Sequence, residues 1–478
     1  MERPDEWVRE RLREHMWSFQ KQVILAVQQH RLVLVKTCHG VGKSWTAART
    51  AGHWLDVHPR GKAFVVTSAP SAPQIKAILW REIGRVHDIG GLDGRVNQLE
   101  WYMTVASGRE ELVAFGRKPD DYDPAAFQGI HARFVLVILD EANGIRGALH
   151  EAASSLIAND YGRMLMIGNP DDPQGEYFEA SKPGSGWFVL QVGAFDSPNF
   201  TGEEIPAELR HDLIGRLYVE EKRRKWAPKW VWIDKEGQPS SPEEGVRVVP
   251  PADIRPEEIN PFWSSKILGE FPAVSLEQSL IPLSWILAAQ KRTLMRRGGG
   301  TIGLDVGAGG DASCGAHNDS GVCRILWEDN NPDTMQTCGK AVEALHEVGA
   351  EKVHVDVIGI GRGVVDRGKE LGEPFFEVNV SDAPDDPKRF LNHRSEIWWD
   401  VRTAFERGQI DLDPEDEDTA AELVEIRYKR SSVGKIQIES KQEAKNRGVK
   451  SPNRAESIML SYAKIRKKYT EATWGAKN

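Results

Sequence analysis

A glycine-rich segment near the start of the chain has the residue types needed to bind the phosphates of a nucleotide. Residues 37–44 have the sequence TCHGVGKS. They follow an apolar run at 32–35 and precede a helix-forming stretch that extends to about Val57. A strand, a glycine loop and a helix in this order are the context that a P-loop requires. The segment therefore predicts a site for ATP.

Each residue type in this loop has its own task. Gly40 and Gly42 would let backbone N–H groups come close to the phosphates. Lys43 would reach the β- and γ-phosphates, and Ser44 would place its hydroxyl on Mg²⁺. We also include Lys36, which directly precedes the loop, in the expected nucleotide-binding set.

An acidic pair further along the chain is the expected partner of the loop. The run FVLVIL at 134–139 is continuously apolar, as in strands that are buried on both faces of a parallel sheet, and it ends in Asp140 and Glu141. Carboxylates at this edge of a parallel sheet face the ligand crevice. We expect Asp140 to hold Mg²⁺, directly or through water, and Glu141 to polarise the attacking water. Apolar runs at 64–67 and 163–167 predict further strands of the same sheet.

Two polar residues are candidates for supporting roles, each with an ordinary alternative. Gln20 lies just upstream of the first strand and could hydrogen-bond the edge of an adenine, or it could be a surface glutamine of a helix. Asn169 follows the strand at 163–167 and could sense the γ-phosphate, or it could cap a turn before Pro170.

A planar, permanently charged arginine is the group that a neighbouring subunit would use to complete a nucleotide site. Arg133, directly before the acidic strand, is our candidate for this arginine finger. Arg117, Arg146 and Arg163 compete with it.

The last third of the chain carries three separated carboxylates. Asp305 ends the strand-like run TIGLD, and Asp356 ends the alternating run KVHVD. Glu456 lies near the start of a predicted helix, for which Ser451 is the expected N-cap. We expect the three to hold two Mg²⁺ or Mn²⁺ ions that activate water against a phosphodiester. Asp311 is a weaker candidate, because a Gly-Gly-Asp turn has an ordinary structural explanation.

The order of the elements around these carboxylates indicates a particular fold. Three strand-like runs joined by tight turns occupy 301–328 and predict an antiparallel meander. A helix over about 334–348, the strand that ends in Asp356 and a further helix follow. This βββαβα order is that of the RNase H-like fold. The sequence thus predicts an α/β protein in which a RecA-like (ASCE) P-loop ATPase domain with a parallel sheet precedes an RNase H-like nuclease domain.

Composition limits the remaining possibilities. The chain of 478 residues has a formal net charge of −9, so any contact with nucleic acid must be local. Basic clusters at 222–225, 291–297 and 464–468 could each be a phosphate track or a solvated face. The four cysteines form no CxxC pair, which favours isolated reduced thiols and a cytosolic setting. No apolar stretch approaches membrane-spanning length, so we expect neither a signal peptide nor a membrane anchor.

With these residues in hand, the chain resembles the large terminase subunit of tailed bacteriophages from about Trp17 to Ala463. The strings that carry the resemblance are KTCHGVGKS at 36–44, LDEA at 139–142, IGNP at 167–170, FDSPN at 195–199, LGEFP at 268–272 and NHRSEIWW at 392–399. Thr37 replaces the first glycine of the standard P-loop, which is usual in this family. Terminases often have Asp where Glu456 stands and frequently have Asp where Asn453 stands, so the resemblance leaves the strength of metal binding open.

The resemblance implies a DNA-packaging motor that also cuts concatemeric DNA. Its expected partners are double-stranded DNA, a portal protein, a small terminase subunit and further copies of the chain in a ring, expected as a pentamer, in the host cell cytoplasm. The expected domains are ATPase (1–199), lid and linker (200–265), nuclease (266–470) and tail (471–478). The tryptophans of the lid region are expected to pack rather than to stack on bases.

Two other classes of protein share some of these features. A helicase-nuclease of repair or restriction has both chemistries, but it needs a second set of motor strands, and the sequence after Pro170 shows none. A non-catalytic capsid or portal assembly protein with a relict fold is disfavoured, because five acidic or basic catalytic positions remain in register.

Overall fold

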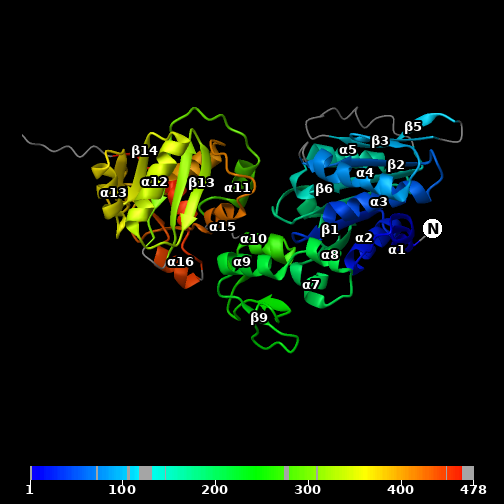
Figure 1. The fold of residues 1–478 in the computed structure, drawn as a ribbon, viewed down its shortest axis with the longest axis horizontal. Helices are drawn as coiled ribbons and strands as arrows, with labels where there is room; N and C mark the ends of the chain where they lie inside the picture. The colour runs from blue at the N-terminus through cyan, green and yellow to red at the C-terminus, as the bar shows by residue number, and fades with distance from the viewer. Residues whose placement is uncertain are drawn as a thin grey trace, which may run out of the picture. The chain divides into compact units, whose positions relative to one another are not determined.

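The computed structural model divides the chain into two compact units, Met1–Val274 and Ser275–Asn478 (Figure 1). It describes residues 3–70, 74–104, 108–117, 132–145, 147–273, 279–307, 311–447 and 449–465. Arg146, most of the basic cluster at 464–468 and the tail at 471–478 lie outside the described residues.

The first unit is built on an eight-stranded sheet with the order β3-β4-β5-β2-β6-β7-β1-β8. All neighbours from β5 to β8 are parallel, and β4 and β3 add an antiparallel edge. The strands are β1 (Leu32–Thr37), β2 (Ala63–Ser68), β3 (Arg95–Asn97), β4 (Glu100–Thr104), β5 (Glu110–Arg117), β6 (Phe134–Asp140), β7 (Arg163–Gly168) and β8 (Phe188–Val192). The predicted parallel sheet is confirmed. Because β7 lies between β1 and β6, the residues that follow these three strands meet at one edge of the sheet.

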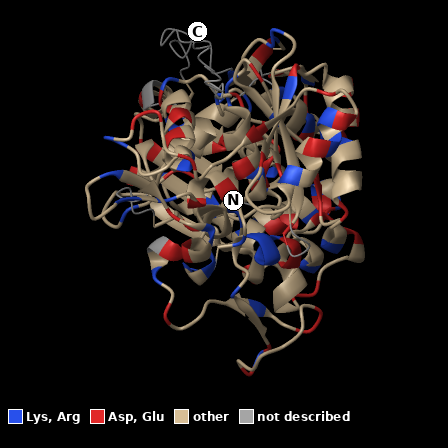
Figure 2. Ribbon diagram, turned by 90° about the vertical axis from the view of Figure 1, so that its left-hand side faces the viewer, with Lys and Arg blue, Asp and Glu red and all other residues tan. Residues whose placement is uncertain are grey.

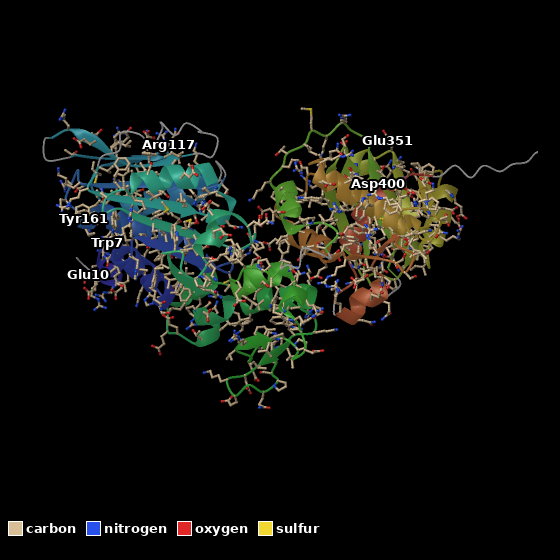
Figure 3. The ribbon with its side chains drawn as sticks, turned by 180° about the vertical axis from the view of Figure 1, so that it is seen from behind. Trp7, Glu10, Arg117, Tyr161, Glu351 and Asp400 are labelled. Atoms are coloured by element: carbon tan, nitrogen blue, oxygen red, sulfur yellow. The ribbon has the colours of Figure 1, made fainter. Side chains whose placement is uncertain are left out.

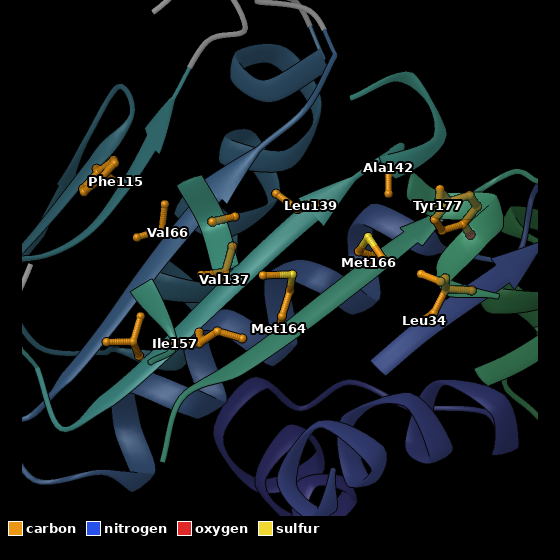
Figure 4. Close-up of a cluster of buried hydrophobic side chains, with 13 residues drawn as sticks. Leu34, Val66, Phe115, Val137, Leu139, Ala142, Ile157, Met164, Met166 and Tyr177 are labelled. Atoms are coloured by element: carbon orange, nitrogen blue, oxygen red, sulfur yellow. The ribbon is translucent and has the colours of Figure 1, made fainter. Parts of the chain in front are cut away.

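The apolar run of β6 is buried on both faces of the sheet, as its sequence predicts. Val137 and Leu139 belong to a core cluster under α5 and α6, together with Met164 and Tyr177 (Figure 4). The opposite face is covered by α3. The helices of this part are α1 (Pro4–Trp7), α2 (Ser18–Gln29), α3 (Lys43–Val57), α4 (Trp80–Gly90), α5 (Gly147–Leu156) and α6 (Gly175–Ala180).

The segment after β8 consists of short elements that pack with the first unit. They are α7 (Pro198–Thr201), α8 (Ala207–Asp212), α9 (Arg216–Trp226), β9 (Val231–Ile233), β10 (Arg247–Val249) and α10 (Pro261–Trp263). The four tryptophans of this region are buried, as expected of packing residues: Trp226, Trp230, Trp232 and Trp263. Three cations of its basic cluster pair along α9 with Glu220 and Glu221. Lys222 and Glu220 are buried, so only part of this cluster is solvated. Residues 266–273 also belong to this unit, so the first unit extends beyond the boundary that we expected at 265/266.

The second unit contains a five-stranded sheet with the order β13-β12-β11-β14-β15. The strands are β11 (Thr301–Asp305), β12 (Ser313–Asp319), β13 (Val322–Asp329), β14 (Lys352–Asp356) and β15 (Phe375–Val378). The first three pair antiparallel, whereas β11, β14 and β15 run parallel. This topology confirms the predicted RNase H-like fold. A separate hairpin pairs β16 (Tyr428–Arg430) with β17 (Ile436–Ile438).

Helices cover both faces of this sheet. They are α11 (Leu283–Gln290), α12 (Thr334–Val348), α13 (Gly361–Glu370), α14 (His393–Glu406), α15 (Glu417–Glu425), α16 (Lys441–Arg447) and α17 (Asn453–Ser461). Side chains of α12 and α13 share a core cluster with β11 and β14. On the other face α17 packs against β11, β12 and β14. Ile397, Trp398, Val401 and Phe405 of α14 are buried, as their spacing predicts.

Charges of both signs are interspersed along the ribbon (Figure 2). All four cysteines are buried and free. Among the described residues, no helix is long and apolar enough to cross a membrane.

Candidate functional site

The loop between β1 and α3 has the backbone shape that its glycines predict. Gly40 and Gly42 have φ values of +63° and +79°, a region that favours glycine. Gly42 is the N-cap of α3, and no side chain of the described residues caps this helix end. The first N–H groups of a helix have no partners within the helix, so this loop and the start of α3 can offer them to phosphates.

Residues from three neighbouring strands meet beside this loop. The Lys43 ammonium donates to Asn169 Oδ1 at 3.0 Å and lies 3.5 Å from Glu141 Oε1. Ser44 Oγ donates to Asp140 Oδ2 at 2.7 Å. Asn169 also donates to the carbonyl of Thr37 at 2.6 Å. The structure therefore brings five sequence-predicted residues of the nucleotide site together, namely Lys43, Ser44, Asp140, Glu141 and Asn169.

The two carboxylates of this cluster differ in environment. Burial, with help from the charge of Glu141, raises the pKa of Asp140 to about 6, while Ser44 and Lys43 oppose the shift. Glu141 has a φ of +48°, which is uncommon for a residue with a side chain. Strained backbone of this kind gathers at functional sites. Asp140 is thus a buried group that a divalent cation would keep ionised, and Glu141 stands next to it at the crevice edge.

Gln20 and Lys36 lie near the loop but have partners of their own. Gln20 is buried, and its Oε1 accepts from the backbone N–H of Trp17 at 3.3 Å. Its Nε2 lies so close to Gly42 that a Cβ there would approach it to 2.8 Å. The Lys36 ammonium lies 5.9 Å from the centre of the Phe271 ring. Nucleotide contacts of both residues stay predictions.

The segment after β8 contacts the P-loop directly. The Ile214 N–H donates to the carbonyl of Gly40 at 2.7 Å, and the His39 N–H donates to the carbonyl of Lys266 at 3.0 Å. The Tyr218 hydroxyl lies 3.3 Å from His39 Nδ1. Burial lowers the pKa of His39 well below its usual value, and the charges of Lys266, Lys43 and Lys222 lower it further. His39 is therefore neutral at pH 7 and can link the loop to α9 by hydrogen bonding.

The candidate arginines lie at different edges of the sheet. Arg133 precedes β6 and stacks 4.4 Å from the centre of the Tyr161 ring, and Arg163 begins β7. Both are separated from Asp140 by the length of a strand, about 20 Å, so neither reaches the nucleotide site of its own subunit. Arg117 ends β5 at the same edge as the P-loop; Arg117 and Tyr161 are labelled in Figure 3. An arginine finger supplied to a neighbouring subunit stays a prediction.

The second group of chemical residues lies at the strand ends of the five-stranded sheet. Asp305 and Asp356 end β11 and β14, which are parallel neighbours with Leu304 opposite Val355. The two carboxylates therefore stand side by side. Burial raises the pKa of Asp356 to about 6, and the charges of Asp305 and Glu456 add to this shift. Burial also raises the pKa of Asp305, against the opposing charge of Lys441.

Glu456 reaches the same place from α17. The helix lies directly on Gly303, where a Cβ would meet the carbonyl of Ser457 at 2.0 Å. Burial would raise the pKa of Glu456, but Arg394 and Lys441 hold it below its usual value. Arg394 forms an ion pair with Glu456, and the Lys441 ammonium lies 3.3 Å from Asp305 Oδ2. Asp311 pairs with Lys445 at 3.4 Å.

The donor set suits a hard divalent cation. Two buried carboxylates, Asp305 and Glu456, and the half-buried Asp356 influence one another's ionisation. Carboxylate oxygens are the ligands that Mg²⁺ and Mn²⁺ prefer. Within the described part of the chain, however, no three His, Cys, Asp or Glu side chains converge as a finished metal site. Glu456 instead pairs with Arg394, and Asp305 pairs with Lys441.

Three residues that contact these carboxylates or the start of α17 were missed by sequence reasoning. Lys441 and Arg394 pair with carboxylates that are far away in the sequence, so no spacing in the sequence indicates these partners. The third is Glu422, whose Oε2 accepts from the N–H groups of Arg454 and Ala455 at 2.8 and 3.1 Å. Our prediction that Ser451 caps this helix is wrong. Its hydroxyl is buried and has no hydrogen-bond partner among the residues that the structure describes. The reason is that α17 begins two residues later, and its first N–H groups donate to Glu422 of α15 instead.

The fold and the two groups of residues describe a chain with two chemical sites on two different sheets. A P-loop with its acidic partner strand on a parallel sheet precedes an RNase H-like sheet with carboxylates at adjacent strand ends. No protein-family model and no curated protein matches the chain.

Solved structures of large terminases are similar to it. The large terminase of the thermophilic bacteriophage D6E covers 94% of this chain and 98% of its own, with 11% identity and a TM-score of 0.40. The nuclease domain of the large terminase subunit gp2 of bacterial virus Sf6 covers 39% of this chain and 100% of its own, with 22% identity and a TM-score of 0.35. The large terminase nuclease of thermophilic phage G20c covers 40% of this chain and 100% of its own, with 16% identity and a TM-score of 0.31.

Proposed function

We propose that this chain is the large terminase subunit of a tailed bacteriophage. It uses ATP hydrolysis to drive double-stranded DNA into a procapsid, and it cuts concatemeric viral DNA with a metal-dependent nuclease. The observation that carries this proposal is the presence on one chain of two separate centres, the Lys43–Asp140–Asn169 cluster and the Asp305–Asp356–Glu456 group. A protein that both moves and cuts DNA needs both chemistries.

In the motor, Lys43 and the N–H groups of the P-loop bind the phosphates of ATP. Ser44 and Asp140 would hold Mg²⁺, and Glu141 would orient the attacking water and accept its proton. Asn169 holds the Lys43 ammonium and the carbonyl of Thr37, so it can detect the loss of the γ-phosphate. Segment 200–265 acts as the lid, since Ile214 and Tyr218 contact the P-loop directly.

In the nuclease, Asp305, Asp356 and Glu456 bind Mg²⁺ or Mn²⁺. Ions held there would supply an activated water and would stabilise the leaving oxygen of the phosphodiester. The chain's own contribution is to fix two carboxylates on adjacent rigid strands and to bring the third from α17. Lys441 and Arg394 balance the negative charge of the group.

The expected assembly follows from the same function. Copies of the chain form a ring on the portal protein, a small terminase subunit selects the DNA, and an arginine such as Arg133 enters the neighbouring nucleotide site. A helicase-nuclease is less well supported, because the described residues after β8 contain two hairpins and the RNase H-like sheet but no second parallel motor sheet.

The deciding experiment combines two assays on the same preparations. Supercoiled plasmid is incubated with Mg²⁺ or Mn²⁺, and ATP hydrolysis is measured in parallel, for wild type, Asp305→Asn and Glu141→Gln. We expect Asp305→Asn to lose cleavage and keep hydrolysis, and Glu141→Gln to do the reverse. Asp329→Asn is the matched control, because Asp329 ends β13 of the same sheet but pairs with Lys340 at the surface. Cleavage that persists in Asp305→Asn would refute the nuclease assignment, and failure of wild type to hydrolyse ATP would refute the motor.

A further inference from the structure

The third carboxylate of the nuclease group is held by an arginine from another helix. Arg394, in the first turn of α14, donates through Nη2 to Glu456 Oε1. The Arg394 side chain is 14% exposed and that of Glu456 is 5% exposed. Water screens a pair this deep only weakly, and an arginine–carboxylate hydrogen bond is directional. The pair therefore fixes where the Glu456 carboxylate points.

The same guanidinium also holds a second segment of the site. Arg394 Nη1 donates to the backbone carbonyl of Glu439 at 2.8 Å. Glu439 lies two residues before Lys441, whose ammonium pairs with Asp305. One side chain thus connects the helix that carries Glu456 to the segment that carries the cation beside Asp305.

Arg394 is itself held in place by its surroundings. Its backbone N–H donates to the carbonyl of Val380 at 2.9 Å. The Asn392 side chain caps α14 by accepting from the Ser395 N–H at 3.0 Å. The Ser395 hydroxyl in turn accepts from the Ile438 N–H at 3.2 Å, which ties α14 to β17. An arginine at a capped and anchored helix start is preorganised to orient a partner.

We propose that Arg394 is a positioning residue of the nuclease, which aims Glu456 at the ends of β11 and β14 and keeps the segment of Lys441 in register. The proposal rests on the nuclease function proposed above. The planar fork of arginine serves both contacts at once, whereas a lysine has a single ammonium and cannot span both acceptors in the same geometry. The longer side chain of glutamate, compared with aspartate, makes such a restraint more important, because it has one more rotatable bond to fix.

The test compares Arg394→Lys and Arg394→Met with wild type. Mn²⁺ binding is measured by calorimetry on the full chain, plasmid cleavage is measured with Mn²⁺, and the melting temperature is measured in EDTA. Residues that orient metal ligands typically cost about 10- to 100-fold in affinity or activity when replaced. We expect a loss in this range for Arg394→Met and a smaller but measurable loss for Arg394→Lys, with ATP hydrolysis unchanged. Arg367→Met is the control, because Arg367 forms an exposed arginine–glutamate pair with Glu370 in the same unit.

A double-mutant cycle separates positioning from a merely structural role. If Arg394 acts through Glu456, Arg394→Met causes no further loss of Mn²⁺ affinity in a Glu456→Gln background. An equal loss in both backgrounds would overturn the proposal. So would wild-type Mn²⁺ affinity in Arg394→Lys, and this variant decides alone if Arg394→Met does not fold. Failure of the proposed function is distinguishable, because wild type would then neither bind Mn²⁺ nor cut DNA.

Discussion

Replacing Gly303 by alanine should impair DNA cleavage and leave ATP hydrolysis intact. Gly303 lies two residues before Asp305 on β11, so both face the same side of the sheet, where α17 packs. A Cβ at this position would lie 2.0 Å from the carbonyl oxygen of Ser457 and 2.5 Å from the nitrogen of Ser461. Both atoms belong to the backbone of α17, so a side-chain rotation cannot relieve the contact.

The size of the effect follows from these distances. A Cβ must stay at least 3.0 Å from other heavy atoms, so α17 has to move away by about 1 Å. Such overpacking costs about 1–3 kcal/mol of stability. Because Glu456 precedes Ser457 on the same rigid helix, its carboxylate moves too, and a misplacement of about 1 Å at a catalytic centre costs on the order of 100-fold in rate.

The assay is the initial rate of plasmid cleavage in Mn²⁺, with ATP hydrolysis and circular dichroism measured on the same samples. Gly339→Ala is the matched control. It lies inside α12, and apart from the neighbouring backbone no described heavy atom lies within 4 Å of the added methyl. The variant should therefore be neutral or should stabilise the helix by about 0.5–1 kcal/mol. A folded Gly303→Ala variant that cuts DNA at the wild-type rate would refute the view that α17 must approach β11 this closely.

Two further predictions concern single polar groups. Asn169→Ala removes the acceptor of the Lys43 ammonium and the donor to the Thr37 carbonyl. We therefore expect ATP turnover to fall by about tenfold or more while DNA cleavage is kept. Wild-type turnover of the variant in a steady-state ATPase assay would contradict the role of Asn169 in the nucleotide site. Glu422 has its pKa raised to about 8, above all by burial, so it binds a proton in the folded state at pH values where the unfolded chain has lost it. Because of this group, the free energy of unfolding should fall by about 1.4 kcal/mol per pH unit between about pH 5 and pH 8. Chemical denaturation in EDTA should therefore show a weaker dependence of this free energy on pH for Glu422→Gln than for wild type. The same dependence on pH in both proteins would refute the prediction.

Local patterns in the sequence were enough to predict both folds and the strand ends that carry the carboxylates. The apolar run of β6 predicts a buried strand, and the glycines at 40 and 42 predict a phosphate-binding loop, from a few neighbouring residues alone. A charge at the end of an apolar strand also has few explanations, so Asp140, Asp305 and Asp356 could be selected without coordinates.

What the sequence could not indicate are contacts between elements far apart in the chain. Arg394 and Glu456 are separated by 62 residues, and Lys441 and Asp305 by 136. Neither pair leaves a periodic signal, and the chain offers many other arginines and lysines as partners. The prediction that Ser451 caps α17 failed for a related reason. A serine before a proline is a good local cap, but the packing of α15 places Glu422 at the helix start, and this tertiary contact replaces the local one.

The hydrogen bonds from Ile214 to Gly40 and from His39 to Lys266 have a consequence for how such a chain can be recombined. A chimera that takes its P-loop from one parent protein and residues 200–270 from another would combine a loop with a segment that evolved to contact a different loop. An exchange near residue 274 disturbs none of these bonds. In recombining genomes, the P-loop and the segment that hydrogen-bonds to it should therefore be inherited together.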